Sequence, residues 1–94
     1  MKVNDFKSRK EQLSREAGKR AFDKFSNYLG FSDLYSLSQL DKAEYTWRKM
    51  INFTGTDAED WEHEAREYDC QTFAQGFFQR SYEVWKELEV RLSE

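Results

Sequence analysis

Apolar and polar positions alternate along the first 30 residues with the period of an α-helix. Apolar side chains recur at intervals of three, four or seven residues, and the series consists of Phe6, Leu13, Ala17, Ala21, Phe25 and Tyr28. This spacing places the apolar side chains on one face of a helix. The pattern therefore predicts a helix from about Asn4 to Leu29.

The middle of the chain carries a second, shorter apolar series. Residues 30–38, GFSDLYSLS, have the composition of a connector, and the helical period is clear after them. We expect a second helix that starts near Ser36 or Ser38 and ends at about Phe53. Its apolar face consists of Leu37, Leu40, Ala43, Trp47, Met50 and Ile51.

The last third of the chain has two apolar series instead of one. The first contains Ala58, Trp61, Ala65, Tyr68 and Thr72, and the second contains Cys70, Ala74, Phe77, Ser81, Trp85, Leu88 and Leu92. At about 100° per residue, the two series lie roughly 150–180° apart around one helix. A straight helix cannot bury both against one core. We expect a continuous or gently bent helix from 57 to 92, with Gly76 as its weak point and with apolar surface left for a partner.

These segments predict an all-α fold. Residues 1–94 form one domain, a small antiparallel bundle of three or four helices with a long C-terminal helix. The chain contains no proline, and although 35% of its residues are charged and its mean hydropathy is −1.00, 17% are aromatic. Disordered chains are poor in aromatic residues, so this composition indicates a folded protein.

Charge is distributed unevenly along the chain. Residues 1–50 carry a net charge of +4, whereas residues 51–94 carry −7. This asymmetry indicates either a charged partner or two halves that attract each other within the bundle.

The acidic segment TDAEDWEHEAREYD, residues 56–69, is a candidate for metal or proton chemistry. It contains seven carboxylates and the only histidine, His63. One histidine supplies a single D-x-x-H element, too little for a dinuclear helix-bundle site, so we expect no metal and no cofactor. Cys70 lies seven residues further along, about 10 Å away on a helix, and its place in an apolar series indicates a buried thiol. The sequence therefore predicts a protein without catalytic activity.

The chain also lacks the apolar segments that membranes require. No apolar run approaches the roughly 20 residues that span a bilayer, and the first residues, MKVNDFKSRK, lack the apolar core of a signal peptide. We therefore expect a cytoplasmic protein that does not enter a membrane.

Our main hypothesis is a regulator or inhibitor that docks on a larger protein. An acidic row would guide the approach, since carboxylates attract basic surfaces, and aromatic side chains would anchor the complex. The row consists of Glu59, Glu62, Glu64 and Glu67, and the anchors are Trp61, Phe78, Tyr82 and Trp85. A homodimer through the C-terminal helix is a further expectation. In length, charge and lack of catalytic motifs the chain is similar in style to the small helical proteins with which bacteriophages block host enzymes or defence complexes.

The alternative hypothesis is a nucleic-acid-associated regulator. The first 24 residues contain eight cations, and phosphate binding favours such clusters. In this interpretation, a homodimer presents the first helix twice, and Arg9, Arg15, Lys19 and Arg20 contact the phosphates.

Overall fold

A computed structural model describes the backbone of residues 3–55 and 58–93 and the side chains of residues 7–55 and 61–93. Within these residues all regular structure is helical, which confirms the all-α prediction. The elements in order are α1 (Val3–Phe25), the 3₁₀ turn η1 (Ser26–Tyr28), α2 (Phe31–Ser38), the 3₁₀ turn η2 (Lys42–Glu44), α3 (Trp47–Thr54), α4 (Ala58–Glu64) and α5 (Cys70–Ser93).

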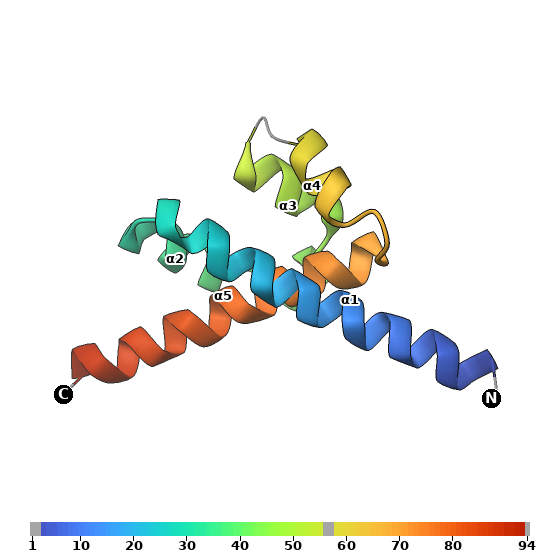
Figure 1. The fold of residues 1–94 in the computed structure, drawn as a ribbon. Coiled ribbons are helices and arrows are strands. Elements are labelled where there is room, and N and C mark those ends of the chain that lie inside the picture. Colours follow the sequence, from blue (N-terminus) through green and yellow to red (C-terminus); the bar gives the residue numbers. More distant parts are fainter. Residues whose placement is uncertain (1–2, 56–57, 94) are drawn as a thin grey trace.

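The two long helices, α1 and α5, cross each other and support the other elements. In Figure 1 α2 lies at one end of this crossing, α3 and α4 pair on one side of it, and the two termini project at opposite ends. The projecting ends make the molecule elongated, with extents of 48 × 30 × 22 Å.

Glycines allow the backbones of α1 and α5 to touch. A Cβ atom at Gly18 would overlap with the carbonyl oxygen of Phe73, and a Cβ atom at Gly76 would overlap with the carbonyl oxygen of Arg15. Only glycine permits such an approach. The crossing is therefore closer than ordinary side-chain packing between helices, whose axes lie about 8–10 Å apart.

Ser14 adds a polar link at the same crossing. Its side chain is fully buried, and its hydroxyl donates to the carbonyl oxygen of Lys10 at 2.7 Å. The Ser14 hydroxyl oxygen in turn accepts a hydrogen bond from the backbone N–H of Asp69 at 2.9 Å. A buried hydroxyl without partners would cost free energy, and these two bonds satisfy it. The bond to Asp69 also holds the start of α5 against α1.

Aromatic rings fill the core around the crossing. Phe22 meets Phe77 edge to face at 5.3 Å between ring centroids, and Tyr45 stacks on Phe78 at 5.4 Å. Trp61 packs against Phe77 at 5.8 Å. Such pairs add to the stabilisation that comes from burying their area.

The prediction of one helix from about Ser36 or Ser38 to Phe53 is wrong, because two helices, α2 and α3, occupy this region. The Asp41 carboxylate accepts a hydrogen bond from the N–H of Ala43 at 2.9 Å, and the Thr46 hydroxyl accepts one from the N–H of Lys49 at 3.1 Å. Each of these bonds caps a new helical start and competes with continuation of the preceding helix. The segment from Gln39 to Thr46 therefore bends between α2 and α3.

The continuous third helix is also wrong. α4 ends at Glu64, and a turn separates it from α5, which begins at Cys70. The Asp69 carboxylate accepts hydrogen bonds from the N–H and the hydroxyl of Thr72 and so acts as the N-cap of α5. Gly76, the expected weak point, lies inside α5 as a regular helical residue.

This break buries both apolar series in one core. Trp61 and Ala65 come from the first series and Phe77 and Trp85 from the second, and all four are buried. The apolar surface that we expected a partner to cover is largely covered by the chain itself. Cys70 differs from its prediction in the opposite sense, since it is exposed.

Replacing either crossing glycine with alanine should destabilise the protein strongly. Elsewhere in a helix this change stabilises by up to about 1 kcal/mol. At Gly18 or Gly76 it forces the two backbones apart, and we expect a loss of about 3 kcal/mol or more in the free energy of unfolding, measured with urea. Gly30→Ala is the control, because its Cβ would meet only ordinary contacts. If the G18A and G76A variants were as stable as the wild-type protein, the close backbone contact between α1 and α5 would be contradicted.

Candidate binding surfaces

Ion pairs connect the basic first helix with the acidic second half of the chain. Lys19 pairs with Glu83 at 3.2 Å, and Lys24 pairs with Glu64 at 3.5 Å. The pair between Arg80 of α5 and Asp23 of α1, at 2.9 Å, has the opposite polarity, with the cation on α5. Each exposed pair contributes at most about 1 kcal/mol, but together they show that part of the charge asymmetry acts within the fold.

The predicted acidic row is divided by the break after α4. Glu62 and Glu64 lie on α4 and Glu67 in the turn that follows, and all three are exposed; the side chain of Glu59 lies outside the described residues. Glu67 lines a hollow of about 510 Å³ together with Arg9 and Lys10 of α1. The carboxylates therefore face different surroundings, and Glu64 and Glu67 lie close to cations of α1.

Three of the four predicted aromatic anchors belong to the core. Trp61, Phe78 and Trp85 are buried, whereas Tyr82 is 41% exposed. The indole N–H of Trp85 donates to the Glu89 carboxylate at 2.7 Å. A partner could reach Tyr82 without rearrangement of the fold, but not the other three rings.

The four cations of the alternative hypothesis do not form one surface. Arg9 and Arg20 are exposed, Arg15 is half-buried, and Lys19 is paired with Glu83. The backbone of Arg15 lies in the helix crossing. These positions separate the cations into two sides of α1.

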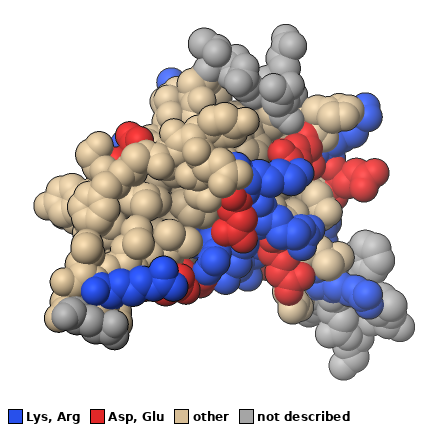
Figure 2. Space-filling view, turned by 60° about the vertical axis from the view of Figure 1, so that its left-hand side comes forward, with Lys and Arg blue, Asp and Glu red and all other residues tan. Residues whose placement is uncertain are grey.

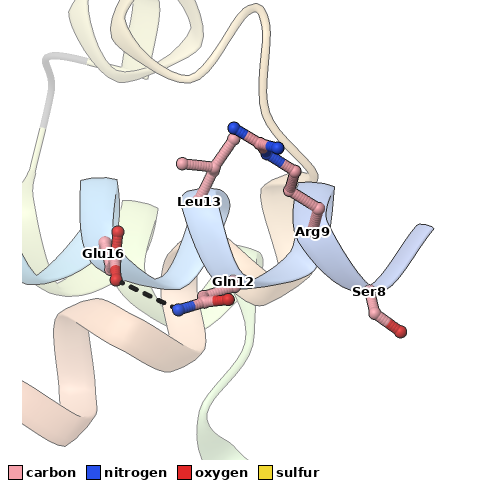
Figure 3. Close-up of a pocket in the computed structure, with 5 residues that line it drawn as sticks. All are labelled: Ser8, Arg9, Gln12, Leu13 and Glu16. Carbon is pink, nitrogen blue, oxygen red and sulfur yellow. Dashed lines mark hydrogen bonds between the residues drawn. The ribbon is translucent and has the colours of Figure 1, made fainter. Parts of the chain in front are cut away.

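The outward side of α1 bears a shallow hollow of about 510 Å³ (Figure 3). Arg9 and Leu13 lie on one side of the helix in this view, and Gln12 donates to the Glu16 carboxylate at 3.5 Å. Leu13 was expected in the apolar face, but it is exposed because α5 crosses α1 beyond it. The lining mixes one cation, one anion and neutral groups, so the hollow favours no single ligand class.

An aromatic surface that the sequence analysis did not identify lies at the corner between α1 and α2. Tyr28, Phe31 and Tyr35 are between 52% and 83% exposed. The rings of Phe31 and Tyr35 lie against Trp85 at 5.1 and 5.5 Å between centroids. We call this surface the uncharged face, and it consists of Tyr28, Phe31, Ser32, Tyr35, Ser36 and Gln39, all exposed.

A gap in the charge pattern is the signal that could have revealed this surface. Residues 26–40 include one charged residue, Asp33, in a chain that is 35% charged. In Figure 2, where the end of the molecule that carries α2 comes forward, Lys, Arg, Asp and Glu gather on one half and a broad area beside it has few of them. The exposed aromatic rings are therefore not simply part of a charged, solvated surface.

The described residues contain no group of three or more His, Cys, Asp and Glu side chains placed to hold a metal ion. None of the helices in this part of the chain is long and apolar enough to span a bilayer.

Comparison of the chain with protein-family models, curated proteins and solved structures gives no match.

The Asp69 cap should make stability depend on pH. Hydrogen bonds from Thr72, together with the nearby Lys10 and Lys7, hold the pKa of Asp69 below its ordinary value. A carboxyl group whose pKa is lower in the folded than in the unfolded state stabilises the folded protein at pH values above its unfolded-state pKa. This contribution is lost as the pH falls through the folded-state pKa. We expect Asp69→Ala to lower the free energy of unfolding by about 1 kcal/mol at pH 7.

The difference between wild type and D69A should shrink as the pH falls below about 4, where the carboxylate of the unfolded chain becomes protonated. Urea unfolding at several pH values measures it. Glu62→Ala provides a control on α4. A difference that stays constant down to pH 2 would show that Asp69 does not act through its charge.

Proposed function

We propose that this protein is a non-catalytic regulator that docks on a larger protein through the uncharged face. The observation that carries the proposal is the exposure of Tyr28, Phe31 and Tyr35 in a segment with one charge, within a chain that is 35% charged. Loss of charge and enrichment in aromatic residues are what distinguish the centre of a protein interface from other surfaces.

The surroundings of the aromatic side chains support this use. Phe31 and Tyr35 lie one turn apart on α2, and both rest on the buried Trp85. Because this support restricts the rings before binding, less conformational entropy is lost in a complex. Anchors at positions i and i+4 of a short helix suit a hydrophobic groove on the partner.

Serine and tyrosine dominate the rest of the surface. Ser32 and Ser36 flank the rings, and Tyr and Ser together are typical of surfaces that combine rigid contact area with adaptable hydrogen bonds. The exposed carboxylates Glu62 and Glu67 lie on other elements, so in this proposal they steer the approach of a basic partner and contribute little to the anchoring. Inhibition of an enzyme or a defence complex, in the style of small phage-encoded proteins, is the form of regulation that we favour.

The nucleic-acid alternative has weaker support from the geometry. Lys19 is already paired with Glu83, and the net charge of the chain is −3, which repels a polyanion. DNA binding that weakens steeply with salt and is lost in the Arg9→Glu, Arg20→Glu double variant would nevertheless favour this alternative.

The double variant Phe31→Ser, Tyr35→Ser should weaken partner binding strongly. It removes both anchors from α2, and aromatic anchors at interface centres often contribute 2 kcal/mol or more each, so we expect affinity to fall at least about 100-fold. The partner is isolated by pull-down from the source cells, and its affinity for each variant is then measured by calorimetry.

Two controls accompany this measurement. Circular dichroism verifies that the variant remains helical, and Gln12→Ser, Leu13→Ser removes side chains of similar exposure from α1. Unchanged affinity of the partner for the F31S/Y35S variant would contradict docking on the uncharged face. Loss of binding in a Glu62→Lys variant alone would contradict it as well.

A further inference from the structure

The last turns of α5 continue the apolar surface of the uncharged face. Trp85 is the ring on which Phe31 and Tyr35 rest. Leu88 and Leu92 follow it by three and seven residues, which places them within about 60° of it around the helix. Leu88 is half-buried, whereas Leu92 is 69% exposed, and Figure 1 shows this end of α5 projecting from the body of the molecule. The exposed rings and the end of α5 therefore form one apolar surface.

The area of this surface is close to what a protein interface requires. An aromatic side chain covers about 150–250 Å². Tyr28, Phe31 and Tyr35 are between 52% and 83% exposed, so the three rings together offer roughly 300–450 Å², and Leu92 adds to this area. A standard interface takes about 800 Å² from each partner, of which slightly more than half is non-polar. One copy of the chain thus presents enough apolar area for one side of a stable interface.

The lack of charge favours a second copy of the chain as the partner. In a symmetric dimer the same patch lies on both sides of the two-fold axis, so a charge near the axis faces a charge of the same sign and repels it. Residues 26–40 carry only Asp33. Its carboxylate is half-buried and accepts a hydrogen bond from the N–H of Gly30 at 2.9 Å. The uncharged face can therefore meet a copy of itself without repulsion.

The charges beside Leu88 and Leu92 are also compatible with a second copy. On one edge, the Glu89 carboxylate accepts hydrogen bonds from the indole N–H of Trp85 at 2.7 Å and from the Lys86 ammonium group at 3.3 Å, so its charge is balanced within one copy. The other edge carries Glu87 and Arg91, one turn apart. In a second copy that runs antiparallel, Glu87 of one copy can lie opposite Arg91 of the other, and opposite charges across an interface favour association.

We propose that two copies of this chain form a dimer in which the end of α5 and the uncharged face of one copy pack against those of the other. The contacts come from Leu92 and the exposed rings, whereas the buried Trp85 supports them from below. This dimer does not depend on the proposed function. A larger protein that docks on the uncharged face would nevertheless have to displace the second copy, so self-association would limit docking at high protein concentration.

Sedimentation equilibrium of the intact protein at about 100 μM tests the dimer, a concentration at which a micromolar dissociation constant gives mainly dimer. We expect a mass near twice the chain mass of 11.4 kDa. Leu92→Lys should raise the dissociation constant at least about tenfold, because each dimer would then bury two charges without a partner. The Phe31→Ser, Tyr35→Ser variant should weaken the dimer as well, since it removes the rings on the same surface.

Val90→Lys is the matched control. Val90 is 60% exposed on the same turn of α5, but it points about 160° away from Leu92 around the helix, so V90K should dimerise as the wild-type protein does. A monomeric wild type, an equal effect of L92K and V90K, or a dimer that persists in F31S/Y35S would overturn the proposal. A monomeric wild type would leave docking on a larger protein intact, because the affinity of that partner for F31S/Y35S is measured separately.

Discussion

The backbone contact between α1 and α5 is the constraint on which the rest of the structure depends. Gly18 and Gly76 each face a carbonyl oxygen of the other helix, so the two helices approach more closely than side chains would allow. Ser14 ties the same crossing to the start of α5 through the N–H of Asp69. Because the crossing leaves little space, the large aromatic rings pack around it instead of within it, and α2, α3 and α4 cover them.

This constraint also determines which surfaces remain for function. The break before Asp69 turns both apolar series toward one core, so Trp61 and Trp85 support the fold. Exposed aromatic area remains at the corner between α1 and α2, where Phe31 and Tyr35 rest on Trp85. One buried ring, that of Trp85, thus links the core to the proposed docking surface.

Sequence periodicity predicted the helical class and the first helix, since α1 is long and its buried face repeats regularly. It did not predict the break between α4 and α5.

The capping of α5 by Asp69 is a local signal, but the bond from Asp69 to Ser14 joins residues 55 positions apart, and no periodic pattern reports such a contact. For the same reason three of the four predicted aromatic anchors are buried. Two apolar series on opposite sides of one helix indicated a docking surface, but a turn of five residues between α4 and α5 buries both series in one core. The scarcity of charged residues at positions 26–40 was visible in the sequence. The sequence did not show, however, whether the aromatic side chains of this segment are exposed or buried, and only the structure shows that they are exposed.

Nuclear Overhauser effects across the helix crossing test the account most directly. We expect cross-peaks between the Hα protons of Gly18 and the amide proton of Phe77, and between the Hα protons of Gly76 and the Hα proton of Arg15, because a Cβ atom on Gly18 would lie 2.9 Å from the Phe77 nitrogen and one on Gly76 would lie 2.9 Å from the Arg15 Cα. The same spectra should lack the regular helical pattern across residues 65–69. Helical connectivities that continue from α4 into α5, without cross-peaks between the two glycines and the opposite helix, would contradict it.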